Sequence, residues 1–289
     1  MLAWTARNLA QRGIEGARLD AELLLGHALG LRRIDLYVRH DQPLTDPELA
    51  RVRALVERRR RFEPVAYILG EREFYGRTFH VDARVLIPRP ETEGVVDEAL
   101  RALPPPAEGV SPRVLDVGSG SGVIALTVAL ERPDVTVVAV ELSPAAAEVT
   151  RMNLARWKIE DRVEVREGSL YKPTQGERFA VIVSNPPYIP TAEVDGLMPD
   201  VSRHEPRLAL DGGEDGTTVL GPLVLGAPRH LSPGGALVVE LGWDQAARAR
   251  DLAARAGFGS IAVERDTAKI ERVLVAVLSP TGEPGAEPL

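Results

Sequence analysis

The chain has 289 residues, a formal net charge of −7 and no cysteine. Its length suits about two domains, and the absence of cysteine excludes disulfides and thiolate metal sites and favours a cytoplasmic setting. No apolar run approaches the ~20 residues of a membrane span, the first residues lack the pattern of a secretory signal, and the negative charge argues against stable binding of long nucleic-acid duplexes.

Residues 1–70 are predicted to form a small helical domain, because apolar side chains recur there at helical spacing. Within it, the stretch Thr45–Glu48 carries the proline and the acids that open a helix. The run Arg58–Arg61 should lie near the C-terminus of that helix, where cations suit the helix dipole, and form a solvated face. A binding patch for a partner is the alternative.

Residues 71–90 are predicted to be a β-hairpin connector. The pattern changes there from helical to alternating, and Gly76 stands where a turn is expected. Pro90, together with the acids Glu91 and Glu93, then opens a helix that should run to about Leu103.

Residues 91–279 alternate strands and helices, which is typical of a mainly parallel sheet with helices on both faces. The link between the last two strands is too short for a parallel crossover, so they should pair antiparallel. The fold class is therefore α/β, a seven-stranded Rossmann-like sheet, followed by a tail, 280–289, that should be disordered. The predicted strands are Arg113–Val117, Val135–Val140, Val163–Glu167, Phe179–Val183, Ala236–Glu240, Ile261–Arg265 and Arg272–Leu278.

A glycine loop connects the first of these strands to a helix. Gly118, Gly120 and Gly122 can take positive φ angles and let a ligand lie against the backbone at a helix N-terminus. A dinucleotide fingerprint would need its third glycine at position 123, where Val123 stands, and no lysine follows as in a P-loop. The implied ligand is a nucleoside without a pyrophosphate.

Glu141 ends the second strand, the place where an acid holds ribose hydroxyls in such folds. The alternative is that Glu141 caps the helix that begins at Ser143-Pro144. Asp116, just before the loop, should tie the loop together rather than perform chemistry. The loop and Glu141 resemble those of the S-adenosylmethionine-dependent methyltransferases of the seven-stranded class.

The fourth strand ends at Val183, and Asn185-Pro186-Pro187-Tyr188 follows. The prolines lack backbone donors, so this segment cannot extend the sheet. It should lie beside the methionine end of the cofactor, near the switch point of the sheet. There the Asn185 side-chain oxygen and the Pro186 carbonyl can accept the two hydrogens of one planar NH₂ group. Tyr188 offers that group a flat face, and its hydroxyl can reach solvent or a partner.

The chemistry expected of this segment is methylation of a planar exocyclic nitrogen. Such a nitrogen is weakly nucleophilic, so orientation matters more than a strong base, and positioning can supply up to ~7–11 kcal/mol. We expect Asn185, Pro186 and Tyr188 to be catalytic, and we expect no metal. Adenine methyltransferases of nucleic acid and glutamine methyltransferases of protein share such a segment.

The whole chain resembles the HemK/PrmC family, which methylates the glutamine amide in the Gly-Gly-Gln motif of class I peptide chain release factors. The segments that carry the resemblance are Glu63–Gly70, the hairpin, Leu86–Glu93, Val183–Pro190 and His204–Gly216. The last of these follows the catalytic segment in a long loop that can act as a lid. The resemblance implies that the helical domain docks the release factor.

The resemblance also implies the roles of the site residues. Relatives commonly carry an acid and an aromatic residue beside the adenine where this chain has Gly168-Ser169-Leu170. Residues 185–188 would hold the glutamine. The residues expected to bind S-adenosylmethionine are Gly118, Ser119, Gly120, Ser121, Gly122, Glu141, Leu170 and Asn185.

Two other functions are open. A nucleic-acid adenine methyltransferase would need a basic channel and a recognition domain, whereas the first 70 residues carry only 12 arginines against nine acidic residues. A non-catalytic S-adenosylmethionine-binding module would have no reason to keep Asn185 and both prolines beside the cofactor.

Overall fold

The computed structural model describes residues 1–109 and 111–280, and the chain divides into two compact units. The first unit comprises Met1–Glu71 and Leu197–His204, and the second begins at Arg72 and takes in the other described residues. Positions 281–289, nearly all of the predicted tail, lie outside the described residues. None of the helices within the described ranges is long and apolar enough to cross a membrane.

The first unit is helical, as predicted. Its core holds Leu9, Leu24 and Val52, all fully or almost fully buried. The fourth helix opens with a capping box between Thr45 and Glu48, which confirms the predicted start. The helices are α1 (Leu2–Ala10), α2 (Ala17–Leu29), α3 (Arg33–Val38), α4 (Asp46–Arg60), α5 (Val65–Leu69) and α10 (Pro199–Ser202).

The predicted solvated face at Arg58–Arg61 is wrong for one of its four members. The Arg59 side chain is 6% exposed, and its guanidinium binds the carboxylates of Asp20 at 2.7 Å and Asp200 at 3.4 Å. Arg59 follows the buried Val56 by three residues, so helical geometry turns both toward the core. A run of four identical residues conceals that periodicity.

The predicted hairpin is formed by β1 (Glu71–Phe74) and β2 (Arg77–His80). Tyr75 and Gly76, in the turn, both have positive φ angles, 52° and 68°. The connector is part of the hydrophobic core, because Phe74 and Phe79 are buried and their rings meet edge to face at 6.3 Å.

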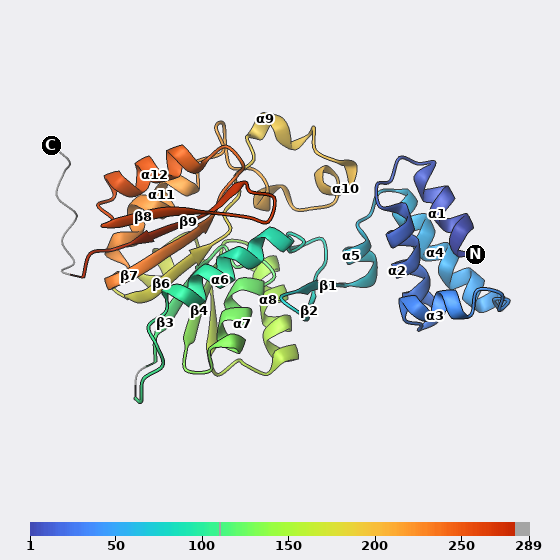
Figure 1. Ribbon diagram of the computed structural model, residues 1–289, viewed down its shortest axis with the longest axis horizontal. Helices are drawn as coiled ribbons and strands as arrows, with labels where there is room; N and C mark the ends of the chain where they lie inside the picture. The colour runs from blue at the N-terminus through green and yellow to red at the C-terminus, as the bar shows by residue number, and fades with distance from the viewer. Residues whose placement is uncertain (110, 281–289) are drawn as a thin grey trace. The chain divides into compact units, whose positions relative to one another are not determined.

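The second unit contains the predicted seven-stranded sheet, in the order β5-β4-β3-β6-β7-β9-β8 (Figure 1). The last two strands pair antiparallel, as predicted, and β9 is also antiparallel to β7. The strands are β3 (Arg113–Val117), β4 (Thr136–Glu141), β5 (Val163–Glu167), β6 (Phe179–Ser184), β7 (Leu231–Glu240), β8 (Ser260–Arg265) and β9 (Glu271–Val277).

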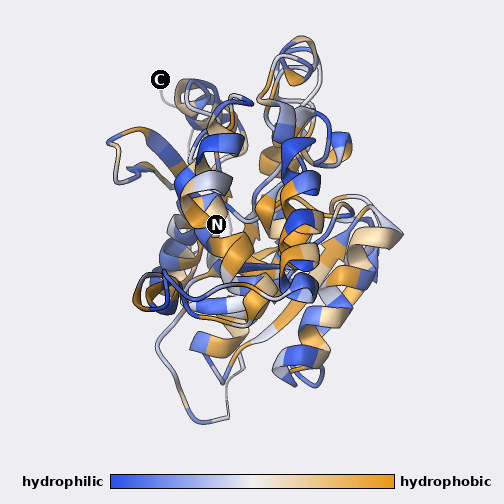
Figure 2. Cartoon of the chain, turned by 90° about the vertical axis from the view of Figure 1, so that its right-hand side faces the viewer, coloured by the Kyte–Doolittle hydropathy of each residue, from blue (hydrophilic) through white to orange (hydrophobic). Residues whose placement is uncertain are grey.

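Two cores cover the two faces of this sheet. Successive residues of a strand point to opposite faces, so Val114 joins one core and Leu115 the other. Hydrophobic residues, orange in Figure 2, lie on strands and on parts of the helices. The first face carries α6 (Glu93–Ala102), α7 (Val123–Glu131) and α8 (Pro144–Trp157), and the second carries α11 (Leu220–Gly226) and α12 (Ala246–Arg255). The shorter elements are α9 (Thr191–Val194), η1 (Pro90–Thr92), η2 (Lys172–Thr174), η3 (Arg207–Ala209) and η4 (Ala227–Arg229).

The sheet register brings three polar side chains to one edge. β3 lies between β4 and β6 and is parallel to both, so the carboxyl ends of these strands meet at a switch point. β6 and β7 are also parallel, with Ser184 beside Val239. Three residues that end or follow these strands therefore lie at the carboxyl ends of the sheet, where a ligand is expected: Glu141, Asn185 and Glu240.

Candidate active site

A cavity of about 420 Å³ lies at this edge, within the second unit. It brings together the glycine loop, the end of β4 and the segment after β6. Two predicted site residues, Gly122 and Tyr188, do not line it. The predicted site residues that do are Gly118, Ser119, Gly120, Ser121, Glu141, Leu170, Asn185, Pro186 and Pro187.

The glycine loop has the conformation that the sequence predicted. Gly118, Gly120 and Gly122 have φ angles of 77°, 56° and 82°. No atom lies within 4 Å of the place where a Cβ would stand on Gly118 or Gly120, so a ligand can lie directly on the backbone there. At Gly122 a Cβ would come within 2.7 Å of Leu126, so this glycine allows close packing behind the loop.

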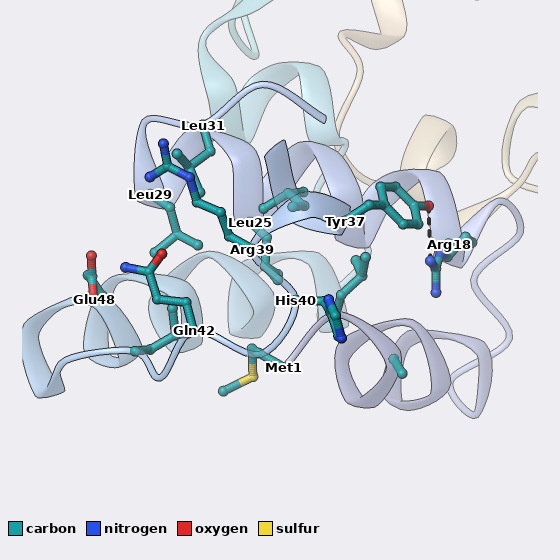
Figure 3. A pocket seen from close by; sticks show the side chains of 14 residues that line it. Met1, Arg18, Leu25, Leu29, Leu31, Tyr37, Arg39, His40, Gln42 and Glu48 are labelled. Carbon is teal, nitrogen blue, oxygen red and sulfur yellow. Dashed lines mark hydrogen bonds between the residues drawn. The ribbon is translucent and has the colours of Figure 1, made fainter. Parts of the chain in front are cut away.

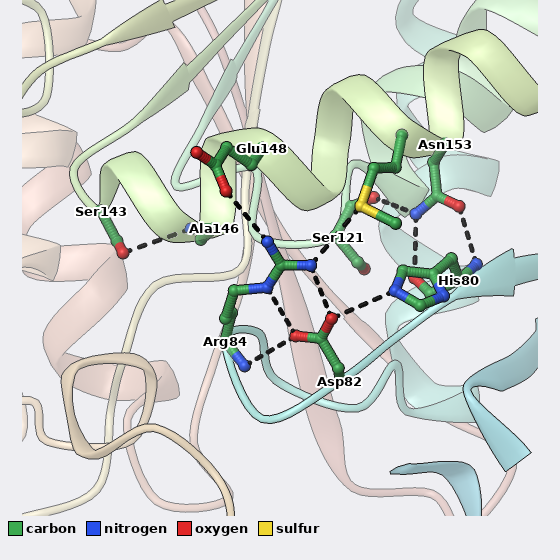
Figure 4. A network of polar contacts seen from close by, with 9 residues as sticks. His80, Asp82, Arg84, Ser121, Ser143, Ala146, Glu148 and Asn153 are labelled. Atoms are coloured by element: carbon green, nitrogen blue, oxygen red, sulfur yellow. Dashed lines mark hydrogen bonds and ion pairs between the residues drawn. The ribbon is translucent and has the colours of Figure 1, made fainter.

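The loop is held from behind by a buried asparagine on α8 (Figure 4). The Asn153 amide donates to the carbonyls of Ser121 at 2.8 Å and His80 at 3.0 Å, and its oxygen accepts from the His80 backbone N–H at 2.7 Å. Asn153 is fully buried. It therefore ties the loop to both α8 and the hairpin, which fixes the loop before a ligand binds.

Arg84 also lines the cavity, and Figure 4 shows its polar contacts. Its guanidinium binds Asp82 at 2.6 Å and Glu148 at 3.0 Å. The hydrogen bond from Arg84 lowers the pKa of Asp82 to about 2. The positive charge is thus already paired, and Arg84 links the chain after β2 to α8.

Glu141 is almost fully buried, and both of its carboxylate oxygens are engaged. One accepts from the Gly120 backbone N–H at 2.8 Å, and the other from that of Ser143 at 2.9 Å. The start of α8 is capped by the Ser143 side chain rather than by Glu141. A carboxylate has about four acceptor positions, so Glu141 keeps acceptors for the hydroxyls of a diol in the cavity.

The surroundings of Asp116 indicate that it supports the fold rather than the chemistry. It is fully buried, one oxygen accepts from the Ala125 backbone N–H at 3.1 Å, and its side chain does not line the cavity. Burial raises the pKa of Asp116 to about 7. Asp116 therefore anchors the first turn of α7, the helix that follows the glycine loop.

Sequence reasoning missed two residues that hold Asn185: Thr92, which itself lines the cavity, and Glu240. The Asn185 amide donates to Thr92 Oγ1 at 3.1 Å, and the Thr92 hydroxyl donates to Glu240 Oε2 at 2.6 Å. The signal for Glu240 was present, because an acid at the carboxyl end of a strand beside the switch point follows the same rule that singled out Glu141. Thr92 lies in a segment, Leu86–Glu93, that the sequence marked without giving it a role.

The Tyr188 hydroxyl has a partner, which is one of the two predicted options. It points to Glu240 Oε1 at 3.4 Å, and burial raises the pKa of Tyr188 to about 12. The backbone of Gly216 packs closely against the Asn-Pro-Pro-Tyr segment. A Cβ on Gly216 would come within 2.4 Å of the Tyr188 carbonyl oxygen. Gln245 Nε2 donates to the Gly216 carbonyl at 2.7 Å and so holds the end of the loop His204–Gly216 in place.

The loop His204–Gly216, which the sequence analysis expects to act as a lid, contributes residues to the cavity. Leu208 and Asp211 are among the residues of this loop that line it. Glu205, almost fully buried, anchors the loop by accepting from the Ile87 backbone N–H at 3.0 Å and from Arg89 at 2.5 Å. The segments Leu86–Glu93 and His204–Gly216 thus meet at the site.

The fold and the site define an S-adenosylmethionine-dependent methyltransferase with an Asn-Pro-Pro-Tyr segment. Residues 1–70 match the model of the PrmC N-terminal domain, and residues 93–198 match that of the methyltransferase small domain. The fold is similar to that of a solved methyltransferase from Pyrococcus furiosus, with a TM-score of 0.53, 18% identity, and coverage of 71% of this chain and 91% of that one.

Two curated relatives match along almost their whole length. The release factor glutamine methyltransferase of Geobacter sulfurreducens is 48% identical, covering 95% of this chain and 94% of that protein. The protein of the same name from Chlorobaculum tepidum is 43% identical, covering 95% of each. The chain belongs to the family of release factor glutamine methyltransferases.

Proposed function

We propose that this protein transfers a methyl group from S-adenosylmethionine to the side-chain amide nitrogen of a glutamine, the one in the Gly-Gly-Gln motif of class I peptide chain release factors. The observation that carries the proposal is that the Asn185 side chain and Pro186 line the same cavity as the glycine loop. Acceptors suited to a planar NH₂ group therefore lie beside the place for the cofactor. Release factors act in the cytoplasm, which is where we place the enzyme.

The cavity suits S-adenosylmethionine in two respects. The open space above Gly118 and Gly120 admits a ligand to the backbone, and Glu141 has acceptors to spare for ribose hydroxyls. Leu170, which also lines the cavity, would lie against the adenine. When bound, the cofactor supplies an electrophilic sulfonium methyl group.

The residues of the chain contribute orientation. The Asn185 oxygen and the Pro186 carbonyl each accept one hydrogen of the glutamine amide, which holds its nitrogen toward the cofactor. The rings of Pro186 and Pro187 fix φ, so the carbonyl is aimed before the substrate arrives. Tyr188, which does not line the cavity, supports the segment through the hydrogen bond of its hydroxyl to Glu240. Alignment of this kind, rather than a strong base, lowers the barrier, and the proton of the methylated nitrogen passes to solvent.

The helical unit is the proposed docking site for the release factor. It contains a cavity of about 380 Å³ with an apolar wall that includes Leu25, Leu29 and Leu31 (Figure 3). Beside this wall, on α3, the apolar side chains of Ile34 and Val38 are 60% and 72% exposed. Exposed apolar side chains around a hollow are common at protein interfaces.

Methyl-transfer assays with separate acceptors test the substrate class. The protein would be incubated with labelled S-adenosylmethionine and one acceptor at a time: a class I release factor, the same factor with Gln replaced by Glu in its motif, and an adenine-containing oligonucleotide. Label in the first acceptor alone supports the proposal. Label in the oligonucleotide would favour an adenine methyltransferase, and binding of the cofactor without any transfer would favour a non-catalytic module.

A further inference from the structure

A buried chain of hydrogen bonds runs from Asn185 through Thr92 to Glu240. The two links are 3.1 Å and 2.6 Å long. Thr92 is 3% exposed and Glu240 is 2% exposed, so water does not compete for these hydrogen bonds. Asn185 and Thr92 both line the cavity, and the chain of hydrogen bonds ends at Glu240 on β7, outside it.

The direction of these hydrogen bonds follows from the chemistry of the last member. An ionised carboxylate only accepts hydrogen bonds, so Thr92 gives its single hydroxyl proton to Glu240. Thr92 Oγ1 can then only accept from Asn185, which turns the NH₂ end of the Asn185 amide toward Thr92. The oxygen of Asn185 is thereby left for the cavity.

We propose that Glu240 and Thr92 are positioning residues that keep the Asn185 oxygen facing the substrate, and so select an amide NH₂ over a carboxylate of the same shape. The inference rests on the proposed function, since it specifies how that site recognises glutamine. Without the chain, the Asn185 amide could turn over by rotation about its last, roughly two-fold torsion. It would then present donors to the substrate and favour glutamate.

Glu240 also holds the other end of the catalytic segment, since its second oxygen accepts from the Tyr188 hydroxyl at 3.4 Å. Burial raises the pKa of Glu240 to about 7, and the negative charge of Glu91 acts in the same direction, whereas the hydrogen bond from Thr92 and the charge of Arg272 lower it. The ionised form, which sets the direction of the chain, therefore dominates above neutral pH. Assays belong at a pH of about 8.5, above that pKa.

The variants that test the chain are Thr92→Val, Thr92→Ser and Glu240→Gln. Valine matches the shape of threonine without the hydroxyl, and serine keeps the hydroxyl. A glutamine at position 240 can offer either an oxygen or an NH₂ group to Thr92, so the direction of the hydrogen bonds is no longer fixed. Thr127→Val is the matched control, because Thr127 is fully buried on α7 and its hydroxyl has no hydrogen-bond partner among the described residues.

The first measurement is steady-state kinetics on a release factor. Thr92→Val and Glu240→Gln should lower kcat/KM by roughly 10- to 100-fold with unchanged affinity for the cofactor, and Thr92→Ser and Thr127→Val should stay close to wild type. The second is inhibition by a motif peptide with Glu in place of Gln, which should become stronger relative to the Gln peptide in Thr92→Val and Glu240→Gln only.

The third measurement does not depend on activity. The side-chain NH₂ protons of Asn185 should exchange slowly with solvent in the wild type and in Thr92→Ser, and faster in Thr92→Val, as followed by NMR. Unchanged exchange, or unchanged preference between the Gln and Glu peptides, would overturn the proposed chain. If instead the wild type fails to methylate the glutamine while the exchange pattern is as expected, the proposed function fails and the positioning of Asn185 stands.

Discussion

Glu141 accepts a hydrogen bond from the Gly120 backbone N–H at 2.8 Å, so the acid at the end of β4 and the glycine loop after β3 form one unit. Glu141→Ala should remove both the brace of the loop and the acceptor for ribose. We expect cofactor affinity to fall roughly 10- to 100-fold, measured by calorimetry. Glu167→Ala is the control, since Glu167 ends the neighbouring β5 with a half-exposed side chain. An equal loss in both variants would contradict this role.

Asn185→Ala should abolish turnover. The variant removes the oxygen that accepts from the substrate amide but leaves the glycine loop and Glu141 in place, so cofactor affinity should stay within a few-fold of wild type. Comparison of kcat with calorimetric binding separates the two effects. Parallel loss of turnover and cofactor affinity would mean that Asn185 holds the cofactor instead.

Val38→Asp should weaken docking without affecting chemistry. The Val38 side chain, on α3, is 72% exposed, so the fold should tolerate the charge. We expect KM for an intact release factor to rise roughly tenfold, with kcat unchanged and with no effect on a short motif peptide. Leu225→Asp, on α11, is the control at a partly exposed leucine of the second unit. Unchanged KM for the intact factor would argue against this docking surface.

Arg59→Met should destabilise the first unit, because it leaves the carboxylates of Asp20 and Asp200 without their buried partner. The expected loss is about 3 kcal/mol, measured by urea unfolding. Arg61→Met serves as the matched control, since the Arg61 side chain is 76% exposed and should cost little. An equal loss of unfolding free energy at positions 59 and 61 would contradict the structural role of Arg59.

Glu22 should make the first unit sensitive to acid. Hydrogen bonds from Tyr37 and then Arg33 lower the pKa of Glu22 from 4.5 to about 2 in the folded state. The stabilisation is therefore present above the unfolded value and is lost as pH falls from about 4.5 toward about 2. Unfolding free energies across this range should fall less steeply for Glu22→Gln than for wild type. Glu57→Gln, at a half-exposed carboxylate, should keep the wild-type slope.

The sequence predicted the sheet, its last antiparallel pair, the hairpin and the glycine loop, because each has a local signal. The strands show as apolar runs, and the loop as glycines whose positive φ angles the structure contains. The Asn-Pro-Pro-Tyr segment was found for the same reason, since proline at the end of a buried strand stands out without any knowledge of its neighbours.

The parts that were missed depend on contacts between distant residues. Thr92 and Glu240 are 148 positions apart and meet only because η1 and β7 come together at the sheet edge. Arg59 is paired with Asp200 across 141 positions, which no local pattern could reveal. The rule that collects acids at the carboxyl ends of parallel strands would have found Glu240, but Thr92 required the structure.

The most direct test of the proposed function is to locate the methyl group by tandem mass spectrometry. A class I release factor would be incubated with the protein and S-adenosylmethionine, digested, and its motif peptide fragmented. We expect one added methyl group, on the side-chain amide of the motif glutamine, and none with Asn185→Ala. A methyl group on any other residue, or an unmodified glutamine after full incubation with active cofactor, would contradict the assignment.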